Sequence, residues 1–269
     1  MRKSINRFVL LLLSFLSLGV PAFSQDTTLN GVKAQLDLMF AGLDKTKVPT
    51  GFLWDTAVNR VEREDYNGVA LTDSNYVSLS VMEDLLYSIN SASVGVDTIG
   101  VQAALARLQR NSSSTTHSVG ILFQPYNYIV ENALTDNLIV YTNDLVSDSY
   151  ISGVWQNPYS EDVLFGYAIG EELSVSLNAT FVFTNIDSLS TRSFQSIQFD
   201  PGDGGGFRTL SFGNFIAANY SEAGYHLTKL KVSYGGVEYQ SHGYVFVENN
   251  TSTQNTMSFS DYIGAVVNC

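Results

Sequence analysis

The chain has 269 residues and a single cysteine, Cys269, which is the last residue. A disulfide within the chain is therefore excluded, and the fold must rest on the burial of apolar side chains. The composition supplies them, since 45% of the residues are hydrophobic and 16 are Phe. A free thiol at the extreme end is unusual for an exported protein. One explanation is that the natural protein continues beyond Cys269.

Basic residues are also scarce: 14 Lys and Arg stand against 26 Asp and Glu, and the formal net charge is −12. Because a surface this acidic repels nucleic acid and anionic lipid, we expect neither as a partner. The expected partners are proteins or polysaccharides at a cell surface, and the chain itself is expected to be a monomer.

Sequence motifs of catalysis are missing. The three histidines, His117, His226 and His242, are far apart and none has a metal-binding spacing such as HExxH. No Gly-x-Ser-x-Gly elbow is present, and the many acidic pairs are typical of a solvated surface. His226 is expected to point inward, with its ring bonded to a backbone partner. We predict a protein that is not an enzyme and needs no cofactor, and we expect no catalytic residue within it.

The first residues indicate export. A positive start with Arg2, Lys3 and Arg7 precedes an apolar run from Phe8 to Leu18, and small residues follow before Gln25. The run is too short to span a bilayer, which takes ~20 residues. We interpret residues 1–24 as a cleaved signal peptide, which makes the protein secreted or cell-surface bound. Cleavage leaves 11 basic and 26 acidic side chains.

Residues 25–110 are predicted to be helical. Apolar residues recur at three- and four-residue steps from Leu29 and Val32 to Leu43, and Pro49 ends that helix. A second helix is expected from about Ser74 to Asn90, capped by Thr72 or Asp73, and a third from about Asp97.

Residues 111–170 are predicted to form a small β region after the polar break at 111–116. Its expected strands are Val119–Phe123, Tyr126–Val130 and Leu138–Tyr141. The loop Trp155–Tyr159 carries aromatic residues, for which packing is favoured over stacking on sugar rings.

Residues 171–250 show the alternation of an antiparallel β-sandwich. The expected strands are 173–177, 181–183, 196–200, 209–212, 215–220, 227–234 and 237–247, with a tight hairpin at Gly235-Gly236.

A motif within that region adds a resemblance. Phe199, Asp200 and the run Gly202-Asp203-Gly204 are followed by Tyr220 and Gly224, with Leu230 and Val232 at inward positions. On these residues, 172–248 resembles a PKD-type domain, an immunoglobulin-like β-sandwich of bacterial surface and secreted proteins. Pro201 stands where that family has Phe. The resemblance implies a spacer or a binding module for protein or glycan.

The glycine-rich turn also offers a candidate metal site. Asp200 and Asp203 lie three residues apart, so both carboxylates are candidate ligands of one calcium ion. Calcium takes six to eight oxygens, and the alternative is a turn in which the aspartates bond backbone N–H groups.

Residues 25–170 resemble, less specifically, the leading regions of exported Bacteroidetes proteins, through the phrase from Leu43 to Gly51. In such proteins a PKD-like module often precedes further domains. Residues 251–269 are interpreted as a C-terminal segment, either the natural end of the protein or a point at which the sequence has been cut short. Two functions follow: a non-catalytic spacer or binding protein, or the N-terminal part of a larger secreted hydrolase. A complete enzyme is the third alternative, and it needs carboxylates that converge in a cleft.

Overall fold

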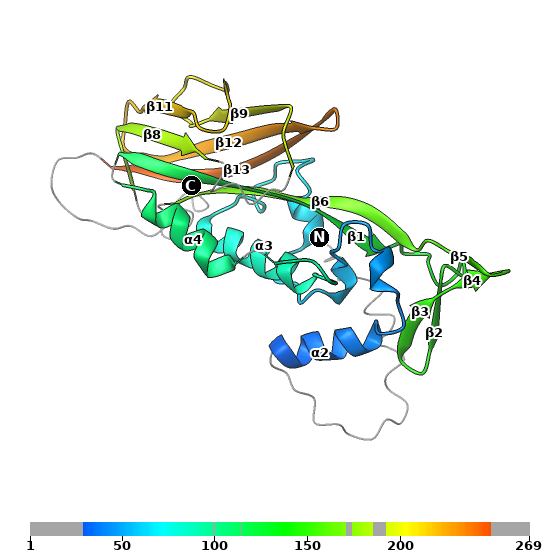
Figure 1. Cartoon of the computed structure of the whole chain (residues 1–269). Helices are drawn as coiled ribbons and strands as arrows, with labels where there is room; N and C mark the ends of the chain where they lie inside the picture. Colours follow the sequence, from blue (N-terminus) through cyan, green and yellow to red (C-terminus); the bar gives the residue numbers. More distant parts are fainter. Residues whose placement is uncertain (1–28, 99, 114, 171–173, 185–191, 249–269) are drawn as a thin grey trace.

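The computed structural model describes residues 29–98, 100–113, 115–170, 174–184 and 192–248, so the expected signal peptide and C-terminal segment lie outside the described residues. The N-terminal part is helical and the remainder is mainly β structure, as the sequence predicts (Figure 1). The described helical elements are α2 (Leu29–Met39), α3 (Leu79–Ser91) and α4 (Val101–Arg110), with 3-10 turns η2 (Lys45–Lys47), η3 (Trp54–Thr56) and η4 (Arg63–Tyr66).

All three expected helices differ in detail from the structure: α2 ends at Met39 rather than at Pro49, and α4 begins at Val101 rather than at about Asp97. Helix α3 begins at Leu79, and the hydroxyl of Ser78 caps it by accepting the N–H of Val81, so the cap expected at Thr72 or Asp73 is wrong. The reason is tertiary, because the N–H of Val77 donates to His242 O and holds the preceding chain extended. In α2 the expected apolar stripe is only partly buried, since Leu29 and Val32 are exposed.

Two long strands form a ladder at the centre of the molecule. Strand β1 (Thr116–Ile129) pairs antiparallel with β6 (Tyr159–Ile169) over 11 residue pairs. The sequence predicted two strands here, but β1 continues through Pro125. The N–H groups of Asn127 and Ile129 point away from β6, to Phe52 O and the Asp55 carboxylate. Pro125 is two residues before Asn127, so its backbone nitrogen also points away from β6. The N–H that proline lacks therefore removes no hydrogen bond between β1 and β6.

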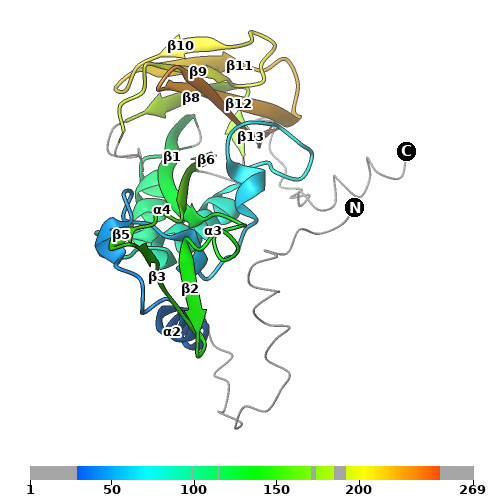
Figure 2. The same cartoon turned by 90° about the vertical axis from the view of Figure 1, so that its right-hand side faces the viewer.

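Each face of this ladder is buried in a different core (Figures 1 and 2). One face packs against α3 and α4 through Leu122, Tyr126, Leu164 and Ala168. The other face looks toward a second sheet. Successive side chains of a strand point to opposite faces, which is how one pair of strands serves two cores.

The other strands complete two sheets of four and five strands. Their orders are β11-β8-β1-β6 and β10-β9-β12-β13-β7. The bounds are β7 Val175–Ser176, β8 Asn178–Phe183, β9 Ser196–Asp200, β10 Arg208–Leu210, β11 Phe215–Asn219, β12 Gly224–Tyr234 and β13 Val237–Glu248. These agree closely with the strands expected between 173 and 247. The β12–β13 turn is the predicted one, with Gly235 and Gly236 both at positive φ.

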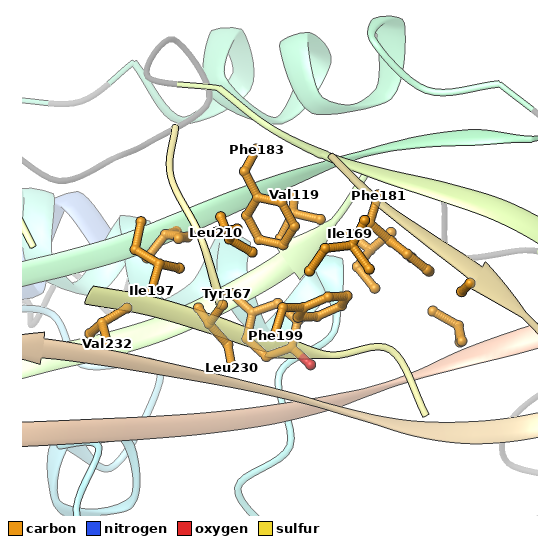
Figure 3. Close-up of a cluster of buried hydrophobic side chains, with 14 of the residues drawn as sticks. Val119, Tyr167, Ile169, Phe181, Phe183, Ile197, Phe199, Leu210, Leu230 and Val232 are labelled. Carbon is orange, nitrogen blue, oxygen red and sulfur yellow. The ribbon is translucent and has the colours of Figure 1, made fainter. Parts of the chain in front are cut away.

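A continuous aromatic and aliphatic core lies between the two sheets (Figure 3). Phe199 of β9 is fully buried, and its ring contacts those of Phe181 and Phe183 from β8 at centroid distances of 5.2 Å each. The expected inward positions Leu230 and Val232 are buried in the same core. Strand β8 pairs in parallel with the start of β1, so the boundary expected at residue 170 runs through one sheet.

Two small hairpins extend from the far end of the ladder (Figure 1). They are β2 (Ile139–Thr142) with β3 (Leu145–Asp148), and β4 (Tyr150–Ile151) with β5 (Val154–Trp155). A third core beneath them combines Phe40 and Leu43 with Ile139, Val146 and Tyr159. Within the described ranges, no helix combines the length and apolar character needed to cross a membrane.

Candidate functional site

The glycine-rich loop between β9 and β10 is held by its first aspartate. The carboxylate of Asp200 accepts the N–H of Gly202 at 2.9 Å, which closes an Asx turn. Gly202 has a φ of 78°, and a Cβ there would lie 2.4 Å from Leu227 O. Both its conformation and its close approach to β12 therefore require glycine.

Asp203 makes the strongest polar contacts of the loop. Nη2 of Arg208 donates to both of its carboxylate oxygens, at 2.6 and 2.7 Å, and the N–H groups of Gly205 and Asn219 donate at 3.0 and 3.1 Å. Burial opposes ionisation of this carboxyl, but the bonds from Arg208 and the two backbone groups outweigh it and lower its pKa. Asp203 is thus a fixed, ionised anchor.

This ion pair also covers a sheet edge. Nη1 of Arg208 donates to Ala217 O at 2.6 Å, while Asp203 accepts from the N–H of Asn219. Both backbone groups belong to β11, the edge strand of the four-stranded sheet. The loop of one sheet therefore takes the place of a missing neighbour strand in the other.

Tyr220 of the motif and the nearby His226 hold the same loop from the other side. The hydroxyl of Tyr220 donates to Pro201 O at 2.7 Å. The two ring nitrogens of His226 lie 3.1 Å from Gly202 O and from Glu222 O, and its ring packs on Tyr220. The predicted backbone partner of His226 is thereby confirmed.

These contacts bear on the calcium prediction. The structure brings Asp200 and Asp203 to one loop, but their oxygens face N–H donors. A calcium ion at Asp203 has to displace the guanidinium of Arg208. Across the described ranges, no group of three or more His, Cys, Asp or Glu is arranged to hold a metal ion. The contacts favour the structural turn, and the calcium site stays a prediction.

The other two histidines lie apart in the fold. His117 is fully buried beside Phe181, and burial lowers its pKa to about 4. Burial likewise lowers the pKa of His242, with a contribution from Lys229. Neutral, buried imidazoles at these positions are typical of packing.

A buried carboxylate that the sequence did not single out lies beside β1. Asp55 is 7% exposed, and its Oδ2 accepts the N–H of Ile129 at 2.8 Å. Burial raises the pKa of Asp55 to about 6, although the bond from Ile129 and the nearby Arg63 act against the rise. Strand β8 pairs only with residues 116–119 of β1. Further along that side of β1, Phe52 O and the Asp55 carboxylate accept the N–H groups of Asn127 and Ile129, as Asp203 and Arg208 bond the free edge of β11.

The loop predicted at Trp155–Tyr159 is wrong at both ends, because Trp155 belongs to strand β5 and Tyr159 begins β6. Trp155 is half-buried and its indole N–H donates to Asp148 at 2.9 Å. The ammonium of Lys47 lies 5.1 Å from the Trp155 ring centroid and 4.9 Å from that of Tyr150, and it is within 4 Å of Asp44 and Asp148. The packing role favoured for Trp155 is confirmed, and Lys47 covers a ring face that a sugar would need.

The hairpins carry the surface that sequence reasoning missed. Six large apolar side chains between residues 134 and 154 are more than a third exposed: Leu134, Val140, Leu145, Tyr150, Ile151 and Val154. We call this set the hairpin end. A sequence signal for it exists, because no Lys or Arg occurs from residue 111 to residue 191. Exposed apolar groups at this density are typical of a contact surface.

No protein-family model matches the chain, and no curated protein matches it.

Proposed function

We propose that the protein is exported and non-catalytic, that it binds protein or polysaccharide at the cell surface, and that a PKD-like β-sandwich over residues 172–248 serves it as a spacer or binding module. One observation supports the non-catalytic part, because it removes the charged group of the motif as a candidate: the carboxylate of Asp203 is bonded on both oxygens, to Arg208 and to backbone N–H groups. A general acid or base must face its substrate, and here the charged group of the motif faces the fold.

The arrangement of strands supports the sandwich. Strands β9, β10, β12 and β13 lie in one sheet and β8 and β11 in the other, with Phe181, Phe183 and Phe199 between them. Alternating inward residues from two facing sheets are what an immunoglobulin-like module needs. This chain departs from a self-contained module in one respect, because β1 and β6 complete the facing sheet.

The proposal that the protein is exported is based on the sequence of residues 1–24. Measuring the intact mass of the native protein tests it. The protein in the culture supernatant of its source is expected to begin at Gln25. An intact mass that retains residues 1–24 contradicts export by cleavage, and a mass well above that of residues 25–269 moves the function to a part of the protein beyond this chain.

Catalysis is tested on the purified chain. Residues 25–269 are incubated with a panel of polysaccharide and ester substrates, and released reducing sugar or acid is measured. We expect no turnover above that of the same substrates incubated without protein. Turnover by the wild-type chain overturns the proposal.

A further inference from the structure

We infer that the hairpin end is the docking surface for a partner protein whose apolar contact site is rimmed by Lys and Arg. The inference rests on the proposed function as a binding protein and names the surface and the partner class.

The geometry of the β4–β5 hairpin separates two faces. Tyr150 pairs with Trp155, and Ile151 with Val154. Because neighbouring residues of a strand point to opposite faces, Ile151 and Val154 lie on the face away from Lys47. They are 50% and 64% exposed, so this face is aliphatic and open.

Both hairpins have tight turns that fix their shape. Asn143 and Asp144 have φ values of 53° and 60°, and Ser152 and Gly153 have φ values of 51° and 80°. Two successive residues with positive φ are typical of type I′ turns, whose twist matches that of the strands. The exposed side chains are therefore presented in a fixed arrangement, which lowers the entropy lost on binding.

The type of side chain argues for a protein rather than a glycan. The ring faces of Tyr150 and Trp155 lie beside the ammonium of Lys47, whereas the open face carries aliphatic groups. Aliphatic side chains offer no ring face for sugar stacking, and they fit the apolar centre of a protein interface.

The charge around the hairpin end indicates which kind of partner protein is favoured. Glu131, Asp136 and Asp144 lie in the same stretch as the hairpin end, and this stretch contributes no basic residue. Lys47, which the chain brings close, is already paired with Asp44 and Asp148. Acidic side chains in the same stretch as exposed apolar ones favour a partner with basic groups beside its apolar contact site, and such charge complementarity speeds association at low salt.

The test places a photo-reactive benzoylphenylalanine at position 151 of the full-length protein in its source cells. The matched control carries the same group at Val237, which is 52% exposed at the β12–β13 turn. We expect a protein adduct at 151 that is absent at 237. The crosslinked protein is then purified, and its affinity for the wild-type chain is measured at low and high salt.

Ile151→Ser with Val154→Ser is expected to weaken that affinity at least about tenfold, while Val237→Ser leaves it unchanged. Raising the salt concentration is expected to weaken it further. The inference is overturned by an adduct of twice the chain mass, by an adduct to lipid or polysaccharide, by equal crosslinking at 151 and 237, or by binding that is insensitive to salt. A partner that binds elsewhere overturns this inference alone, whereas substrate turnover by the purified chain overturns the proposed function.

Discussion

Arg208 holds Asp203 with a single nitrogen, Nη2, which donates to both carboxylate oxygens at 2.6 and 2.7 Å. Its other terminal nitrogen is thereby free to bind β11 at Ala217 O. Asp203 of the motif and Arg208 of β10 thus link the five-stranded sheet to the edge of the four-stranded one. The motif that suggested a metal loop is explained by this connection between sheets.

Loss of that pair is expected to destabilise the fold. Arg208→Ala leaves the carboxylate of Asp203, whose side chain is 4% exposed, without its cation, and should lower the free energy of unfolding by about 3 kcal/mol. Urea unfolding measures this. Arg208→Lys should recover only part of the loss, because an ammonium cannot reach both Asp203 and Ala217. The control, Lys231→Ala, removes the exposed pair with Glu238 and should cost at most about 1 kcal/mol. Equal losses for the two alanine variants contradict the assigned role.

Calcium is expected to leave the melting temperature unchanged. A ligand specific to the folded state must stabilise it, and at Asp203 calcium has to compete with a bonded guanidinium. Thermal unfolding in millimolar calcium and in chelator measures this. A rise in the melting temperature that disappears in Asp203→Asn establishes the calcium site and refutes the structural interpretation of the loop.

Asp55 is expected to make stability depend on pH between about 4 and 6. Its pKa in the folded protein, about 6, lies above the ordinary value of 3.8, so the folded state binds the proton more tightly. Stability from this group is therefore greatest at low pH and falls as the pH rises toward 6, by up to about 3 kcal/mol. Asp55→Asn keeps an oxygen for the Ile129 N–H and should flatten that slope.

The measurement is the free energy of unfolding of both proteins from pH 4 to pH 8. Asp55→Asn should be the more stable protein at pH 8, because it carries no buried charge. The control is Asp84→Asn, in an exposed pair with Arg60, which should leave the slope in place. An unchanged slope in Asp55→Asn shows that another group causes it.

Phe199→Ala is expected to cost about 4 kcal/mol, since it empties the centre of the core between the sheets. Phe199→Leu retains most of the volume and should cost about 1.5 kcal/mol. Phe215→Ala, which removes a ring that is 67% exposed, is the matched control and should change stability by about 0.5 kcal/mol or less. Chemical unfolding of the three variants ranks them, and a small effect at Phe199 argues against a shared core.

Local patterning predicted the strands after residue 173 well, because alternation and the Gly235-Gly236 turn are local properties. Strand β6 (Tyr159–Ile169) was not predicted, although its apolar run is a local signal. The other errors are tertiary. The start of α3 depends on the bond from Val77 to His242 O, and the continuity of β1 through Pro125 depends on which edge faces β6. Neither is visible within a window of a few residues.

The candidate sites divide in the same way. Asp200 and Asp203 were found by their glycine-rich spacing, but the partner Arg208 could not be inferred from spacing alone. Asp55 was missed because its environment arises from β1, more than 70 residues along the chain. The hairpin end had a compositional signal in the absence of basic residues, and its exposure needed the structure.

The two faces of β1 and β6 have a consequence for modularity. Immunoglobulin-like domains commonly occur in tandem and fold independently, so that one domain can be excised and fused to a different neighbour. Here Val119, Ile121 and Phe123 of β1 belong to the core between the sheets, while Leu122 and Tyr126 belong to the helical layer. A fragment that begins at residue 172 lacks two of the four strands of one sheet. In this chain, a fragment that keeps both cores intact must therefore include the helices as well as residues 172–248.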